Sequence, residues 1–331
     1  MTVTPRLFAA LFAALFVGAL ASPTAQQKSS KPSPAIEELL WLLPTDTETV
    51  MVTQPQARTR SLPVDVLSPP DGRVRFPNVG YKETLERHLS GAGFKASVEG
   101  SRRFAPPSGL GGMLYEGANI FLFDKPLAAD GKVLMSVLQK QALRVDVVGG
   151  FTVVEFRDKL ENDVWASYIT VLRPNLLVIA TNLDYLKELI GRRTTRTGAR
   201  ALPSDLREWS WMDAASSFWA VRHFRRDVDS RDPSSPFVKN AAASEFDSGA
   251  VGVATYAADD GRTMVVHYLS TGSNAEDIAR RIWHRPDDGM VPTIRRAAPD
   301  AIEVRFTAGN VEDLSKFLFY LIAVLGHAIY L

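Results

Sequence analysis

Residues 144–190 read RVDVVGGFTVVEFRDKLENDVWASYITVLRPNLLVIATNLDYLKELI, and their pattern is the clearest indication of the fold class. Its runs of β-branched and aromatic residues predict four strands, at 145–148, 152–156, 167–172 and 176–180. The tripeptide Arg173-Pro174-Asn175 between the last two has the composition of a tight turn. Strands joined by short turns pair antiparallel, so we predict an α+β fold with antiparallel sheets and packed helices rather than a doubly wound parallel sheet.

A helix is expected directly after these strands, capped by Asn182 and stopped by Gly191. The same order of elements recurs later in the chain. Strands are predicted at 251–256 and 264–269, and a capping box at 273–276 starts another helix. We interpret this as a weak two-fold repeat of a hairpin-plus-helix unit, with coincidence as the alternative.

The repeat suggests the domain organisation. The polar stretch 192–203 separates a first α+β half, 35–197, from a second half, 198–331. A Pro/Ser-rich segment, 22–34, precedes the first half and has the composition of a linker.

The first 21 residues have the pattern of a secretory signal peptide. Arg6 supplies the positive charge, and Leu7–Ala21 is an apolar run of 15 residues, too short to span a bilayer comfortably. The run ends in Ala19-Leu20-Ala21, the small-x-small pattern of a cleavage site. We therefore predict an exported protein, periplasmic or extracellular, whose mature chain starts at Ser22.

Composition excludes several classes of function. The chain of 331 residues has 38 basic and 37 acidic residues and a formal net charge of +1, which argues against a nucleic-acid partner because such binding needs a basic surplus. With no cysteine, disulfide frameworks, thiolate metal sites and cysteine nucleophiles are excluded. The motifs G-x-S-x-G, G-x-x-x-x-G-K-[ST] and H-E-x-x-H are also absent, so we expect neither a cofactor nor a metal ion.

The C-terminal segment 314–331 is predicted to form a strongly apolar helix. Its last 15 residues, FLFYLIAVLGHAIYL, are interrupted only by Gly326 and His327. A helix this short is more typical of a buried core element than of a membrane span. Docking onto a membrane or a partner protein is the alternative.

One constellation is a candidate for catalysis. If residues 218–224 form a strand, Trp219 and His223 share one face, whereas Arg222 lies on the other. In an enzyme, His223 would act as general base, Asp213 would orient it and Arg222 would stabilise an anion. The alternative is that His223 and Arg222 are satisfied structural residues. Arg192 and Arg193, together with the other arginine pairs, are interpreted as solvated helix ends.

Aromatic residues gather in the same region. Trp209, Trp211 and Trp219 would stack on sugars if they were exposed, since an exported protein meets polysaccharide. Packing in the core is the alternative.

Four short strings resemble segments of a group of exported bacterial proteins. They are Pro106-Pro107-Ser108-Gly109-Leu110-Gly111, Phe218-Trp219-x-x-Arg222-His223-Phe224, Asp232-Pro233-x-x-Pro236-Phe237 and Gly326-His327-Ala328-Ile329-Tyr330-Leu331. The resemblance spans most of the chain after the leader. No activity is attached to that group, so it implies an exported bacterial protein of mixed fold and transfers no catalytic residue.

Two functional hypotheses follow from these observations. The first is a non-enzymatic exported protein that binds an envelope component or a glycan. The second is a hydrolase that acts on an envelope or extracellular polymer with His223 as general base.

Overall fold

A computed structural model of the chain describes residues 31–55, 80–104, 114–160, 163–195, 198–224, 250–260, 262–270, 275–283 and 291–309, and the single helical residues 313, 317 and 321. The predicted signal peptide, most of the predicted linker, three of the four resembling strings and most of the segment 314–331 lie outside these residues.

The described residues form strands, α-helices and short 3-10 helices. The strands are β1 (Thr49–Thr53), β2 (Phe94–Phe104), β3 (Leu114–Phe123), β4 (Arg144–Val148), β5 (Phe151–Leu160), β6 (Asp163–Arg173), β7 (Leu176–Ala180), β8 (Phe218–His223), β9 (Ala250–Ala257), β10 (Thr263–Ser270), β11 (Thr293–Ala298) and β12 (Ala301–Thr307). The helices are α2 (Pro34–Leu42), α4 (Lys82–Leu89), α5 (Lys132–Gln141), α6 (Leu183–Thr195) and α8 (Ala275–Trp283), with 3-10 helices η1 (Ala128–Gly131) and η2 (Arg207–Trp211).

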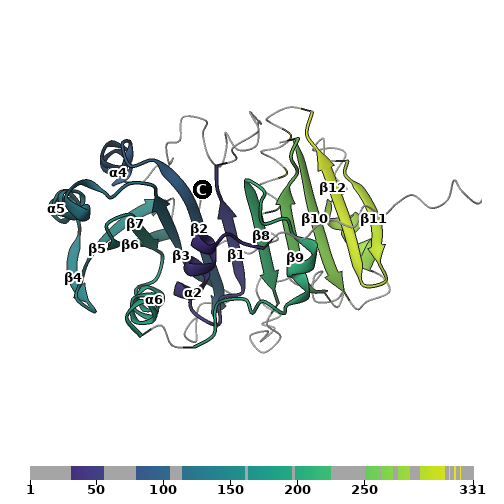
Figure 1. Ribbon diagram of the computed structural model, residues 1–331, viewed down its shortest axis with the longest axis horizontal. Coiled ribbons are helices and arrows are strands. Elements are labelled where there is room, and N and C mark those ends of the chain that lie inside the picture. Colours follow the sequence, from purple (N-terminus) through teal and green to yellow (C-terminus); the bar gives the residue numbers. More distant parts are fainter. Residues whose placement is uncertain are drawn as a thin grey trace, which may run out of the picture.

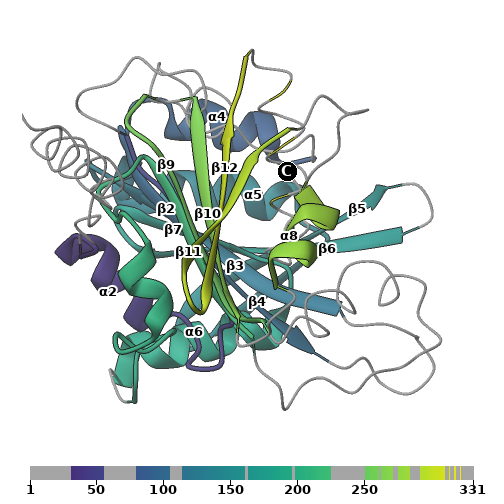
Figure 2. The same ribbon diagram turned by 90° about the vertical axis from the view of Figure 1, so that its right-hand side faces the viewer.

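All described strands join one 12-stranded sheet in the order β11-β12-β10-β9-β8-β1-β2-β3-β7-β6-β5-β4 (Figure 1). The pairing is antiparallel throughout, which confirms the predicted α+β class. Strands β1–β7 occupy one side of the sheet and strands β8–β12 the other. The two groups meet where β1 pairs with β8. The sheet twists strongly, so that β11 and β12 cross the direction of β5 and β6 in Figure 2.

Helices cover both faces of the sheet, because alternate residues of its strands are apolar on each side. On one face, α2, α6 and η2 pack over a core that includes Val50, Val178 and Trp219. On the other face, α4 and α5 cover a second cluster around Phe123, and α8 covers a third around Val304. The sheet is therefore the middle layer of the fold.

Strand β2 is central in the sheet, yet the sequence pattern does not predict it. Its second half, Glu99-Gly100-Ser101-Arg102-Arg103, is too polar to be typical of a buried strand. The structure accommodates it because acidic groups from other elements meet its arginines. Arg103 Nε lies 2.7 Å from Glu48 Oε2, and Arg102 Nε lies 2.6 Å from Glu116 Oε1.

Helix α6 is longer than predicted. It runs to Thr195 and continues past Gly191, so that glycine does not stop it. A glycine in a helix costs about 1 kcal/mol relative to alanine but does not by itself break the hydrogen-bonding pattern. Arg192 also ties the last turn to α2, since its guanidinium donates hydrogen bonds to the Trp41 carbonyl oxygen at 3.0 and 3.2 Å.

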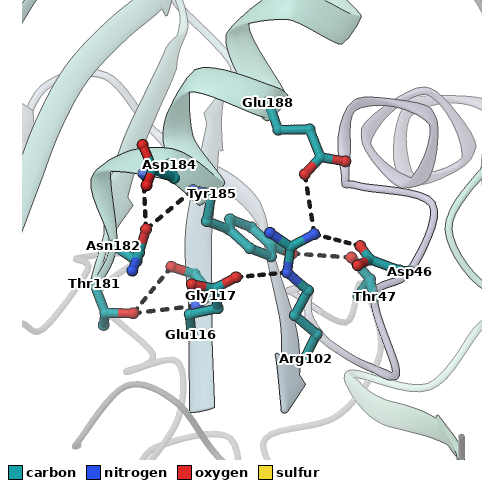
Figure 3. A network of polar contacts seen from close by, with 10 residues as sticks. All are labelled: Asp46, Thr47, Arg102, Glu116, Gly117, Thr181, Asn182, Asp184, Tyr185 and Glu188. Atoms are coloured by element: carbon teal, nitrogen blue, oxygen red, sulfur yellow. Dashed lines mark hydrogen bonds and ion pairs between the residues drawn. The ribbon is translucent and has the colours of Figure 1, made fainter. Parts of the chain in front are cut away.

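The predicted cap of α6 is confirmed. Asn182 Oδ1 accepts hydrogen bonds from the backbone N–H groups of Asp184 (2.7 Å) and Tyr185 (3.2 Å), as Figure 3 shows. We expect Asn182→Ala to lower the free energy of unfolding by about 1 kcal/mol, because it leaves those N–H groups without an acceptor. Asn182→Asp should retain most of the stability. Urea denaturation measures both, and an alanine variant as stable as the parent would contradict the prediction.

The described part of the C-terminal segment packs inside the protein. Phe317 and Leu321 are fully buried, and the Phe317 ring stacks on Phe306 and Trp283 at centroid distances of 4.6 and 4.9 Å. These two residues therefore agree with the core interpretation, whereas the remainder of 314–331 lies outside the described residues. Within the described part of the chain, we find no helix with the length and apolar character that crossing a membrane requires.

Candidate functional site

His223 lies at the end of β8, where the structure gives it an acidic partner. Its Nδ1 atom is 2.7 Å from Glu208 Oε1. The His223 side chain is 38% exposed, whereas that of Glu208 is 2% exposed. Gly252 pairs with His223 across the sheet, and its missing side chain leaves room for Glu208, since a Cβ atom there would overlap the carboxylate. The half-exposed imidazole is thus held by a buried acid.

The geometry corrects the catalytic hypothesis in two respects. The carboxylate that contacts His223 is Glu208 rather than Asp213, whose Oδ1 accepts a hydrogen bond from the Ala215 N–H at 3.0 Å. Arg222 is buried on the opposite face of the sheet, with its guanidinium 4.3 Å from the Phe224 ring centroid. Side chains alternate along a strand, so His223 and Arg222 cannot line one cleft.

Two of the three candidate tryptophans belong to the core. Trp219 is fully buried and Trp209 is 8% exposed, and their rings meet edge to face with centroids 5.9 Å apart. Neither offers a ring face to a sugar. Trp211 is half-buried, and its ring centroid is 4.9 Å from that of His267. Sugar stacking by Trp209 and Trp219 is therefore wrong, and core packing explains them.

The contact between His223 and Glu208 predicts a pH dependence of stability. The hydrogen bond that His223 donates to the Glu208 carboxylate raises the pKa of His223, against the opposing effect of burial. A group whose pKa is raised in the folded state stabilises the protein, and this contribution is fully present below the unfolded-state pKa of about 6.5. The contribution is lost as the pH rises through the folded-state pKa. We expect His223→Gln to flatten this part of the stability profile, measured by urea denaturation at a series of pH values.

The matched control for this measurement is His88→Gln. His88 Nδ1 contacts the Thr84 carbonyl oxygen at 2.8 Å instead of a carboxylate. Identical pH profiles for His223→Gln and the parent would contradict the prediction.

A pocket lies where α2, the end of β6 and the end of α6 meet. Its volume is about 490 Å³, within the range of small-molecule sites. We call it the arginine pocket, and it is lined by Glu38, Trp41, Leu42, Arg173, Arg192 and Arg193. Its lining therefore carries three positive charges and one negative charge.

Only part of this positive charge is neutralised by contacts of the described residues. Arg173 Nη1 lies 2.7 Å from Glu38 Oε1. Arg192 donates to the backbone oxygens of Trp41 and Ala199, and the Arg193 guanidinium lies 4.9 Å from the Phe151 ring centroid. The buried Nε atoms of Arg173 and Arg193 have no hydrogen-bond partner among the described residues. Buried donors of this kind are usually satisfied by water or by an ion.

A polar network at the opposite end of α6 holds the helix in place. Arg102 Nη1 contacts Asp46 at 2.5 Å and Glu188 at 3.0 Å, and the buried Tyr185 hydroxyl lies 3.0 Å from Thr47 Oγ1 (Figure 3). Burial alone would lower the pKa of Arg102, but hydrogen bonds to Asp46 and Glu116 outweigh it and raise that pKa. The network connects α6 to the sheet and so fixes the helix whose last turn enters the arginine pocket.

Sequence reasoning missed Glu208 and the arginine pocket. Glu208 stands between Arg207 and Trp209 in an aromatic segment, and this was the only local signal available. The pocket has no local signal, because Trp41, Arg173 and Arg193 are far apart in the chain. Among the described residues, no group of three or more His, Cys, Asp and Glu side chains is placed to hold a metal ion.

Fold and site together define an antiparallel α+β protein with an arginine-lined pocket. No family model and no curated protein matches the chain. Solved structures of the Treponema protein TP0453 are similar. Crystal form I has 7% identity and a TM-score of 0.44 and covers 88% of this chain and 99% of TP0453. Crystal form IV has 9% identity and a TM-score of 0.44 and covers 89% and 98%, respectively.

Proposed function

We propose that this chain is a non-enzymatic exported protein of the cell envelope that binds an anionic ligand in the arginine pocket. The observation that carries the proposal is the positive lining of that pocket, where Arg173, Arg192 and Arg193 are accompanied by a single carboxylate, Glu38. The signal-peptide pattern of residues 1–21 supports export to the periplasm or the extracellular space.

The lining indicates the chemistry of the ligand. A guanidinium matches the geometry of a carboxylate or a phosphate and donates hydrogen bonds to both oxygens of such a group. Trp41, whose side chain is 44% exposed, and Leu42 add apolar surface beside the arginines. A carboxylate or phosphate attached to a sugar or a lipid headgroup combines both features, and envelope components of bacteria carry such groups.

Calorimetric titration tests this assignment, with glucose 6-phosphate, glucuronate and uncharged glucose as probes. We expect the two anions to bind and glucose not to bind. Arg193→Gln should weaken anion binding by roughly 10- to 100-fold, because a hydrogen bond to a charged group contributes about 1.5–3 kcal/mol. Both anions should lose affinity if the arginine recognises the shared negative charge.

The matched control is Arg296→Gln, which removes an exposed arginine outside the pocket whose Nη1 donates to the Pro299 carbonyl oxygen. Its affinity should equal that of the parent. Equal binding by the Arg193 and Arg296 variants, or no anion binding by the parent, would reject the arginine pocket as the site.

The alternative proposal is a hydrolase acting on an envelope or extracellular polymer with His223 as general base. The contact that favours it is the 2.7 Å hydrogen bond to Glu208, which would orient the imidazole in place of Asp213. The His223→Gln variant decides between the two proposals. Polymer cleavage by the parent that persists unchanged in the variant would eliminate this mechanism.

We also propose that the chain consists of the two halves 35–197 and 198–331, each with a hairpin followed by a helix. Support comes from hairpin β6–β7 before α6 and hairpin β9–β10 before α8. We propose that the segment 314–331 is a core helix, which the burial of Phe317 and Leu321 supports, with docking onto a membrane or a partner as the alternative. Cell fractionation with a high-pH wash of the membranes tests export and docking together. Recovery of the chain in the soluble exported fraction would argue against a membrane anchor, whereas retention on the washed membranes would support one.

A further inference from the structure

Among the described strands, the two at the edges of the sheet, β11 and β4, differ in their exposed residues. Edge strand β11 carries Arg295 and Arg296 and a register irregularity after Arg296, features that protect an edge from pairing with another chain. Edge strand β4 carries exposed apolar residues instead. Val145 is 45% exposed, Val147 is 74% exposed, and Leu143 just before the strand is 64% exposed.

The hairpin geometry shows which backbone groups of β4 face the open edge. Gly149 and Gly150 form a two-residue turn with φ values of 56° and 84°, so Val148 pairs with Phe151 directly beside it. Residues that flank such a turn form a hydrogen-bonded pair, and hydrogen bonding alternates along an antiparallel strand. The backbone N–H and C=O groups of Val145 and Val147 therefore point away from β5.

We propose that β4 pairs antiparallel with β4 of a second copy of this chain, with Val145 at the centre of the pair. In this register Val145 lies opposite the partner's Val145, and Arg144 lies opposite the partner's Asp146. The outward-facing backbone groups then meet each other, and each apolar residue meets an apolar one. Two oppositely charged Arg–Asp pairs therefore form, one on each side of the central pair of Val145 residues.

The charges also exclude the neighbouring register. Centring the pair on Asp146 would place two carboxylates directly opposite each other, which is destabilising. Within one chain, Arg144 Nε already lies 3.0 Å from Asp146 Oδ2 on the exposed strand. The same two residues can therefore form a symmetric four-charge cluster across the proposed interface.

A pair of short strands buries less than the roughly 1,200 Å² of a standard interface, so the dimer should be weak and reversible. Sedimentation of the purified chain at concentrations from about 10 to 500 μM measures it, because dissociation constants in this range are typical of small interfaces. We expect the average mass to rise with concentration toward that of a dimer.

Charge reversal tests the register. Arg144→Asp and Asp146→Arg should each weaken the dimer by about tenfold or more, because like charges then face each other twice. The double variant Arg144→Asp/Asp146→Arg should restore association. Circular dichroism provides the folding control, and Arg296→Gln on the opposite edge provides a control for charge alone.

A parent chain that stays monomeric over this range would overturn the proposal. Single reversals without effect, or a double variant that does not recover, would overturn it as well. The result does not depend on the arginine pocket, since β4 contributes no residue to its lining.

Discussion

Replacing Arg103 by Met is expected to lower the free energy of unfolding by about 3–5 kcal/mol. Arg103 Nε lies 2.7 Å from Glu48 Oε2, and the two side chains are only 3% and 1% exposed. The variant would leave the Glu48 carboxylate buried without its cation, and an unpaired buried charge is far more costly than a lost surface ion pair. Chemical denaturation with circular dichroism measures the effect.

The location of this pair adds to its importance. Glu48 precedes β1, and its carbonyl oxygen accepts a hydrogen bond from the His223 N–H at 2.9 Å, so it lies beside the junction between β1 and β8. The double variant Glu48→Gln/Arg103→Met should recover much of the lost stability, because neither charge of this pair is then left buried without the other. Arg144→Met, which changes a 64% exposed side chain, is the control and should cost little. An Arg103→Met protein as stable as this control would show that the pair is dispensable.

Trp219→Ala is the second change with a large expected effect, a loss of about 3–5 kcal/mol in the free energy of unfolding. Trp219 is fully buried, packs edge to face against Trp209, and lies in the core between β8 and η2. Truncation removes the buried ring and leaves a cavity that the surrounding strands cannot close completely. Its Nε1 atom has no hydrogen-bond partner among the described residues, so the expected loss is one of packing.

Trp41→Ala provides the contrast, because that side chain is 44% exposed. It should cost less than about 1 kcal/mol and should instead weaken ligand binding to the arginine pocket. Thermal unfolding of both variants separates the two roles. Equal stability of Trp219→Ala and Trp41→Ala would contradict the core assignment of Trp219.

The parts of the fold that sequence reasoning predicted are those with strong local periodicity. Strands β4 to β7 have apolar runs separated by turn residues, and α6 has a capping asparagine followed by leucines at helical spacing. Strand β2 escaped prediction because its arginines are buried against Glu48 and Glu116, which come from other elements. A pattern read along the chain cannot supply a partner that arrives from elsewhere.

The candidate sites followed the same division. Alternation along β8 correctly placed Trp219 and His223 on one face and Arg222 on the other, since strand geometry requires it. The partner of His223 was assigned wrongly, because η2 brings Glu208 over the strand from 15 residues away. The burial of Trp219 also depended on which helices cover that face.

The α+β class, the antiparallel hairpins and the cap of α6 could be predicted from the sequence, because they depend on residues close together in the chain. Three features became visible only in the folded protein: the described strands join one sheet, Arg103 is buried against Glu48, and Arg173, Arg192 and Arg193 line one pocket with Trp41. The physical reason is that burial and charge pairing depend on contacts between distant segments. Such contacts exist only once the sheet has formed and the helices have packed on it.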